Sequence, residues 1–185
     1  MALQKLKPYF DRKYGTVTVG TSSQVTDGAA AVLLMKESEA KKRELSVLGY
    51  LKDFTYAGCE PHRMGLGPVF ATAKLLRQTK RSLKDIDLIE MNEAFAAQVI
   101  ANIKAFSSVE FAKKELGQST ALGEIDPDIL NVNGGAIALG HPLGMTGTRL
   151  VITLLHELHR QNKQVGLATL CIGGGQGASL LLEKT

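Results

Sequence analysis

The chain has 185 residues, of which 44% are hydrophobic, and this is enough for one domain, or one domain with an appendage, around a full core. Its net charge of +4 comes from short basic clusters flanked by glutamates, and without tryptophan and with only 5% aromatic residues the sequence argues against nucleic-acid binding. No apolar run reaches the ~18 residues of a membrane span and no secretory signal opens the chain, so we expect a cytoplasmic protein without a transmembrane segment.

The first half of the chain predicts strands and helices in alternation. Two short strands are predicted at 16–19 and 29–35, on either side of a polar loop. A charged helix over 38–45 and an alternating strand over 47–56 follow. Pro68 then stands near the start of a helix, because proline is well tolerated in the first helical turn.

The second half predicts a buried strand, two long helices and a final pair of strands. Ser82 and Asp85 stand three residues apart, as in a capping arrangement for one short turn. Residues 107–130 are irregular, with at most one short helix around 111–116. The regular elements are the strand 86–91, the helices 94–106 and 146–161, and the strands 165–170 and 178–182.

This order predicts an α/β fold with a mixed five-stranded sheet and helices on both faces. Residues 1–40 fit it poorly, because one strand and one polar loop cannot bury an apolar face alone. We therefore interpret 1–40 as the remnant of an N-terminal unit, a loop and its last strand, and 41–185 as a separate domain. The apolar strand 29–35 would then favour dimers or larger assemblies.

Two glycine-dense loops, each after a β-like segment, carry the residues suited to chemistry. One runs from Asn131 to Gly147 and contains His141, which can act as a general base toward a thiol or as a donor to a carbonyl oxygen. The other starts at Cys171, which can be a nucleophile with the Gly173 N–H as oxyanion donor, or a proton carrier. Each loop alone is equally compatible with an ordinary turn. Together they outline an acyl-transfer site.

Other polar residues leave alternatives open. Asn92, between a strand and a helix, can orient a water or donate directly, or else cap the helix. His156 and His159 are one residue short of a metalloprotease pattern, and no second ligand pair accompanies Cys59, so no metal site is expected. If the two glycine loops pack together, His141 and free N–H donors should lower the pKa of Cys171, whereas Cys59 should behave ordinarily.

Six motifs resemble, in order, the C-terminal half of thiolases. They are Gly15–Thr18, Asp27–Ala31, Met64–Pro68, Asn92–Ala96, Gly140–Gly147 and Cys171–Gly177. The sequence is most similar to the degradative 3-ketoacyl-CoA thiolases of fatty-acid β-oxidation that partner a hydratase/dehydrogenase subunit. It departs from that branch at Asn92, where a histidine is usual.

The resemblance implies an acyltransferase that uses coenzyme A as substrate and has no further cofactor. His141 would activate the nucleophilic cysteine, and Asn92 would hold a water in the same oxyanion hole. Cys171 would be the second, acid/base cysteine, and the Gly173 N–H would serve the other oxyanion hole. The residues that would line the pantetheine and acyl pocket are Ser23, Met64 and Phe95.

In thiolases the acyl-accepting cysteine lies in a characteristic turn of the N-terminal half, and this sequence contains no such turn: Cys59 is followed by Glu60-Pro61. Two interpretations follow. The chain is the C-terminal portion of a thiolase, inactive until an N-terminal half supplies the nucleophile. Alternatively, it is a non-catalytic structural or interaction module derived from that fold. A third, less favoured possibility is that Cys171 itself has become the nucleophile.

Overall fold

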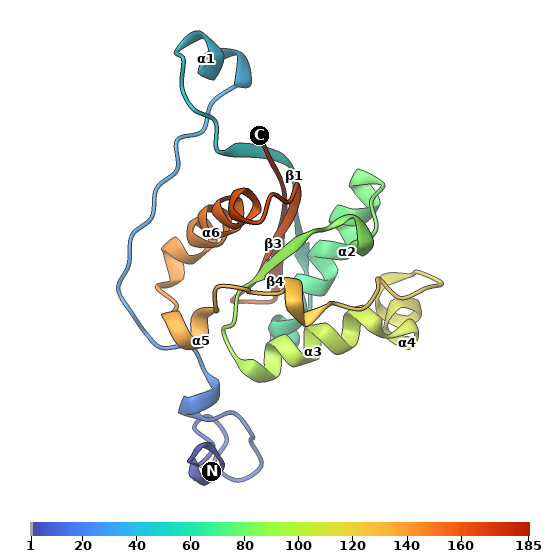
Figure 1. Cartoon of the computed structure of the whole chain (residues 1–185). Helices are drawn as coiled ribbons and strands as arrows, with labels where there is room; N and C mark the ends of the chain where they lie inside the picture. Colours follow the sequence, from blue (N-terminus) through green and yellow to red (C-terminus); the bar gives the residue numbers. More distant parts are fainter. Residues whose placement is uncertain (1) are drawn as a thin grey trace.

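Four strands form one mixed sheet in the computed structural model, which describes residues 2–185 (Figure 1). Their order is β1-β4-β3-β2. Strand β4 runs antiparallel to both of its neighbours, and β3 runs parallel to β2. The strands are β1 (Gly49–Gly58), β2 (Leu88–Met91), β3 (Val165–Ile172) and β4 (Gln176–Lys184).

Both faces of the sheet are apolar, because neighbouring residues of the inner strands point to opposite sides. Leu167 of β3 and Leu181 of β4 belong to one hydrophobic cluster, whereas the adjacent Ala168 and Leu182 belong to a second. A sheet that is apolar on both faces needs helices on both, and this is the arrangement found.

Three helices supply this cover (Figure 1). Helices α2 (Gly67–Thr79) and α3 (Ala96–Ser107) contribute to the first cluster, with Phe106 fully buried. Helix α6 (Thr146–Arg160) lies on the opposite face and contributes Leu150, Leu154 and Leu158 to the second cluster. These leucines recur at helical spacing along one side, so the amphipathic pattern read from the sequence determines which side of α6 is buried.

Several local predictions are confirmed. Pro68 occupies the first turn of α2, and the Ser82 N–H donates to Asp85 Oδ2 at 2.7 Å in a capping arrangement. The stretch 107–130, predicted to contain at most one short helix around 111–116, instead contains α4 (Val109–Phe111), a π-helical turn over Ala112–Leu116 and a 3-10 turn over Pro127–Ile129. The two other short α-helices among residues 2–185 are α1 (Glu37–Lys42) and α5 (Ala136–Leu139).

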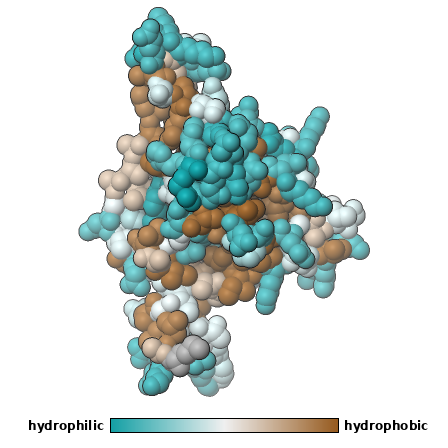
Figure 2. Space-filling model, in the orientation of Figure 1, coloured by the Kyte–Doolittle hydropathy of each residue, from teal (hydrophilic) through white to brown (hydrophobic). Residues whose placement is uncertain are grey.

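The predicted strands at 16–19 and 29–35 are wrong, and the sheet has four strands rather than five. Residues 29–35 run as an extended arm, with Leu33 78% and Leu34 74% exposed. The space-filling view shows hydrophobic residues along the arm that leads to α1 (Figure 2). A strand exists only through hydrogen bonds to a neighbour, and within residues 2–185 no neighbouring strand lies beside this arm.

Outside the four strands, Leu130 forms a single parallel β-bridge with Ile89 of β2. None of the helices formed by residues 2–185 has the length and apolar character needed to cross a membrane.

Candidate active site

The carboxyl ends of two parallel strands bring Asn92 and Cys171 to the same edge of the sheet. Met91, the last residue of β2, is paired with Thr169 of β3, and the Asn92 N–H donates to the Thr169 carbonyl at 3.0 Å. Cys171 follows two residues later on β3. In α/β sheets, ligands bind outside the carboxyl ends of the parallel strands.

Asn92 is buried against His141. Its side chain is 1% exposed, and its Nδ2 lies 3.4 Å from Nε2 of His141. The helix-cap alternative is wrong, because α3 begins at Ala96 with Phe95 at its N-cap position. Oδ1 of Asn92 is buried and has no hydrogen-bond partner among the described residues. A buried acceptor without a partner indicates a place for a donor such as water.

The His141 ring is held at both nitrogens. Nδ1 lies 2.7 Å from Oγ1 of the buried Thr146, and Nε2 faces the amide nitrogen of Asn92. This pattern assigns the proton to Nδ1, leaving the Nε2 lone pair directed toward Asn92. Burial, together with the charge of Arg149, lowers the pKa of His141 below its ordinary value. The ring is therefore neutral at physiological pH and able to accept a proton.

The loop that carries His141 follows the short helix α5, not a β-like segment as predicted. Gly140 has a φ of +90°, a conformation that favours glycine, and a Cβ at this position would meet the Thr26 side chain. A Cβ at Gly147 would lie 3.9 Å from Leu170 of β3, so the end of the His141 loop lies beside the strand that leads to Cys171.

Cys171 stands at the start of a glycine turn whose outer side is open. A Cβ added to Gly173 would meet nothing within 4 Å, so the backbone there is free to approach a ligand. The other side of this turn is bound to the end of β1, because the Cys59 N–H donates to the Gly175 carbonyl at 2.8 Å.

The expected lowering of the Cys171 pKa is wrong. Burial raises the pKa of this thiol and outweighs the backbone hydrogen bond that opposes it. Cys59, expected to behave ordinarily, also has its pKa raised by burial. Both side chains are therefore thiols rather than thiolates at neutral pH.

The N-terminal segment places Ser23 beside Phe95. The Ser23 N–H donates to the Ala94 carbonyl at 3.0 Å, and Ser22 forms a β-bridge with Phe95. The next residue, Gln24, accepts a hydrogen bond from the His141 N–H at 3.0 Å. Ser23 and Phe95 are thus brought to the Asn92–His141 pair, although residues 22–24 lie far from it in sequence.

Met64 is half-buried in the turn Pro61–Leu66, which packs on α3. The contact is made by Asn102, whose Nδ2 donates to the Gly65 carbonyl at 2.7 Å. Met64 therefore stands on the same side of the sheet as α3, whose first turn follows Phe95.

Three residues at the site were missed in the sequence: Gln24, Thr146 and Arg149. Gln24 and Arg149 form hydrogen bonds with the peptide between Gly140 and His141, and Thr146 contacts a ring nitrogen of His141. None of these residue types indicates a catalytic role by itself. The only available signal for Thr146 was its position five residues after His141 at the start of a helix.

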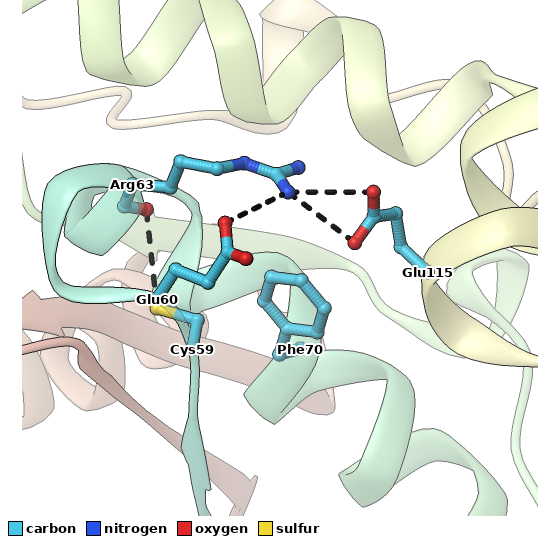
Figure 3. Close-up of a pocket in the computed structure, with 5 residues that line it drawn as sticks. All are labelled: Cys59, Glu60, Arg63, Phe70 and Glu115. Carbon is cyan, nitrogen blue, oxygen red and sulfur yellow. Dashed lines mark hydrogen bonds and ion pairs between the residues drawn. The ribbon is translucent and has the colours of Figure 1, made fainter.

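A pocket lined by Cys59, Glu60, Arg63, Phe70 and Glu115 contains no comparable pair of a histidine and an amide (Figure 3). Arg63 Nη1 lies 3.3 Å from Oε1 of Glu115 and also reaches Glu60, so its charge is already paired. Within residues 2–185 no group of three His, Cys, Asp or Glu side chains is placed to hold a metal ion. His159, one of the histidines considered above, contacts the Leu48 carbonyl.

The raised thiol pKa values predict how the cysteines respond to alkylation. Iodoacetamide should modify Cys59 and Cys171 slowly at neutral pH, with half-maximal rates above the ordinary thiol value of ~8.5 for both. The measurement is a pH series followed by peptide mass spectrometry, with Cys171→Ser as the control that isolates Cys59. A half-maximal rate for Cys171 below pH ~7.5 would contradict the burial argument.

Comparison with known proteins gives consistent matches. Residues 45–184 match the family model described as thiolase, C-terminal domain, and residues 1–38 match thiolase, N-terminal domain. A 3-ketoacyl-CoA thiolase of Colwellia psychrerythraea is 49% identical over 180 residues, and one of Serratia proteamaculans is 51% identical; each match covers 97% of this chain and 41% of the relative.

Among solved structures, human mitochondrial 3-ketoacyl-CoA thiolase in complex with CoA superposes with a TM-score of 0.87 and 41% identity. The dimeric peroxisomal thiolase of Saccharomyces cerevisiae superposes with a TM-score of 0.84 and 42% identity. Both matches cover 100% of this chain and 42% of the other.

Proposed function

Because the chain belongs to the thiolase family, we propose that it supplies the C-terminal part of a 3-ketoacyl-CoA thiolase, which transfers an acyl group between CoA thioesters. The chain spans 41% of the length of the curated relatives cited above. The observation that carries the proposal is the contact between the buried Asn92 and the half-buried His141, set at the same sheet edge as Cys171 and the open Gly173 backbone.

In this proposal His141 is the base that prepares the nucleophile. Its neutral ring, whose Nε2 faces the Asn92 amide nitrogen at 3.4 Å, accepts at that nitrogen the thiol proton of a cysteine supplied by an N-terminal thiolase part. That sulfur then attacks the keto carbon of the 3-ketoacyl-CoA, and collapse of the adduct breaks the bond between the keto carbon and the α-carbon, which gives the acyl-enzyme and the enolate of acetyl-CoA. Asn92 contributes through a water bound at its unpartnered Oδ1, which donates to the oxyanion formed during the attack.

Cys171 is the acid and base of the second half of the reaction. Its raised pKa keeps the thiol protonated, so it can deliver its proton to the α-carbon of the leaving acetyl-CoA enolate. The resulting thiolate takes a proton from the thiol of free CoA, whose sulfur attacks the acyl-enzyme and releases the shortened acyl-CoA. The Gly173 N–H stabilises the oxyanion at this stage.

Substrate contacts follow from the residues around this edge. Ser23, Phe95 and Met64 line the pantetheine and acyl pocket, and coenzyme A enters as substrate with no further cofactor. The arm 29–35 pairs with strands of the N-terminal thiolase part, which would cover the exposed Leu33 and Leu34. As in related degradative thiolases, a hydratase/dehydrogenase subunit is a further partner.

Complementation tests this proposal. The chain alone is expected to show no thiolysis of acetoacetyl-CoA, because the nucleophile is missing. Mixing it with an N-terminal thiolase part that carries the nucleophilic cysteine is expected to restore turnover toward the ordinary enzyme range of ~1 s⁻¹ and above. Hydrogen exchange should show new protection in 29–35 in the same mixture.

His141→Ala is the control variant in the mixture. It should bind the N-terminal part equally well but lose ~100-fold or more in turnover, as expected for a general base. Turnover above ~1 s⁻¹ by the unmixed chain would contradict the requirement for a partner. Assembly without turnover would favour the alternative of a non-catalytic module.

A further inference from the structure

The peptide bond between Gly140 and His141 is held from both sides. Its N–H donates to the Gln24 carbonyl at 3.0 Å, and its carbonyl accepts from Nη1 of Arg149 at 2.7 Å. The first partner comes from the N-terminal segment and the second from α6. A peptide plane with both polar groups engaged cannot rotate without breaking one of these bonds, and its rotation would swing the His141 side chain.

The environment of Arg149 leaves its guanidinium available to hold the Gly140 carbonyl. Arg149 interacts electrostatically with the carboxyl of Glu90 of β2, which is 4% exposed. Burial raises the pKa of Glu90 to about 8; the charge of Arg149 opposes this rise, and the carboxylates of Glu93 and Glu157 add to it. Glu90 therefore keeps its proton at neutral pH, and Arg149 is not drawn into an ion pair with it.

We propose that Arg149 is a positioning residue for His141, holding the Gly140 carbonyl so that the imidazole stays directed toward Asn92. This inference rests on the proposed function for its catalytic meaning and goes beyond it by assigning a residue that touches neither substrate nor the reacting atoms. A lysine at position 149 would keep the charge but lose the rigid planar fork of the guanidinium.

Charge is a second route by which Arg149 acts on the ring. Among residues 2–185, its charge is the one that shifts the pKa of His141, and it acts in the same direction as burial. Removing the charge should therefore let the ring bind a proton at higher pH. Geometry and charge can be separated by two substitutions, because Arg149→Gln removes both and Arg149→Lys removes mainly the geometry.

The test is an NMR study of the full chain without substrate. In Arg149→Gln the His141 ring should titrate at higher pH. The His141 amide should exchange ~10-fold faster, because its peptide loses the bond from Arg149 to the Gly140 carbonyl and the remaining N–H bond to Gln24 opens more often. In Arg149→Lys the ring titration should stay near that of the parent chain while the amide still exchanges faster. Arg160→Gln, a change of charge on the same helix that leaves the Gly140 carbonyl untouched, should alter neither.

Parent-like exchange of the His141 amide in Arg149→Gln would overturn the assignment. If that variant does not fold, the same result in Arg149→Lys would overturn it. In the complemented enzyme, Arg149→Lys should lower kcat with little change in KM. An inactive mixture would contradict the proposed function but leave the NMR results unaffected, so the two failures are distinguishable.

Discussion

Replacing Gly177 with alanine is expected to destabilise the chain by more than ~3 kcal/mol, beyond the usual cost of overpacking. A Cβ at Gly177 of β4 would lie far closer than 3.0 Å to the carbonyl and Cα of Gly67, where α2 begins. The obstacle is backbone rather than a flexible side chain, so it cannot turn away. Helix and strand would have to separate, which would open the first hydrophobic cluster.

The measurement is urea unfolding followed by circular dichroism. Two matched controls carry the same substitution where there is room: Gly144→Ala in the His141 loop and Gly173→Ala in the Cys171 turn, both with nothing within 4 Å of the added Cβ. Each should change the free energy of unfolding by no more than ~0.5 kcal/mol. A Gly177→Ala chain as stable as these controls would show that α2 does not depend on this contact.

Stability is expected to fall as pH rises from about 4.5 to about 8 because of Glu90. Its pKa is raised from 4.5 to about 8 in the folded chain, mainly by burial. In this window the unfolded chain has lost the Glu90 proton while the folded chain keeps it, so each rise in pH favours unfolding. The loss is at most ~1.4 kcal/mol per pH unit and ends above the folded pKa.

Glu90→Gln should remove this contribution and leave the rest of the pH dependence in place. The difference in unfolding free energy between pH 5 and pH 8 should therefore be smaller in the variant, by an amount on the order of several kcal/mol. Glu157→Gln is the matched control, because the pKa of Glu157 is lowered to about 2, chiefly by its hydrogen bond to Arg160. Equal slopes for the parent chain and Glu90→Gln would contradict the prediction.

Local sequence predicted the elements whose signals are themselves local. Pro68 indicated the start of α2, and the Ser82–Asp85 pair indicated the start of the short turn Leu83–Asp85, because capping involves only neighbouring residues. The leucines of α6 predicted its buried side because helical spacing is a property of one segment. His141 and Cys171 were identified as site candidates because their glycine loops are unusual in composition, and the structure places both loops at one sheet edge.

Features that depend on distant partners were not predictable. Residues 29–35 have the composition of a strand, but no neighbouring strand is present within residues 2–185. The pKa of Cys171 depends on how deeply the thiol is buried, which its glycine-rich surroundings concealed. Arg149 lies in the first turn of α6 and reaches the site through the Gly140 carbonyl of the preceding loop, a contact that depends on how that loop folds.

The hydrogen bonds of Ser23 and Gln24 show that sequence modules and functional modules divide this chain differently. The two thiolase segments meet between residues 38 and 45, yet Ser23 is bonded to Ala94 and Gln24 to His141 across that junction. Dividing the chain between residues 38 and 45 would separate His141 from Gln24, whose carbonyl accepts the hydrogen bond of the His141 N–H. Any recombination of thiolase halves that preserves the site should therefore exchange residues 22–24 together with the loop around His141.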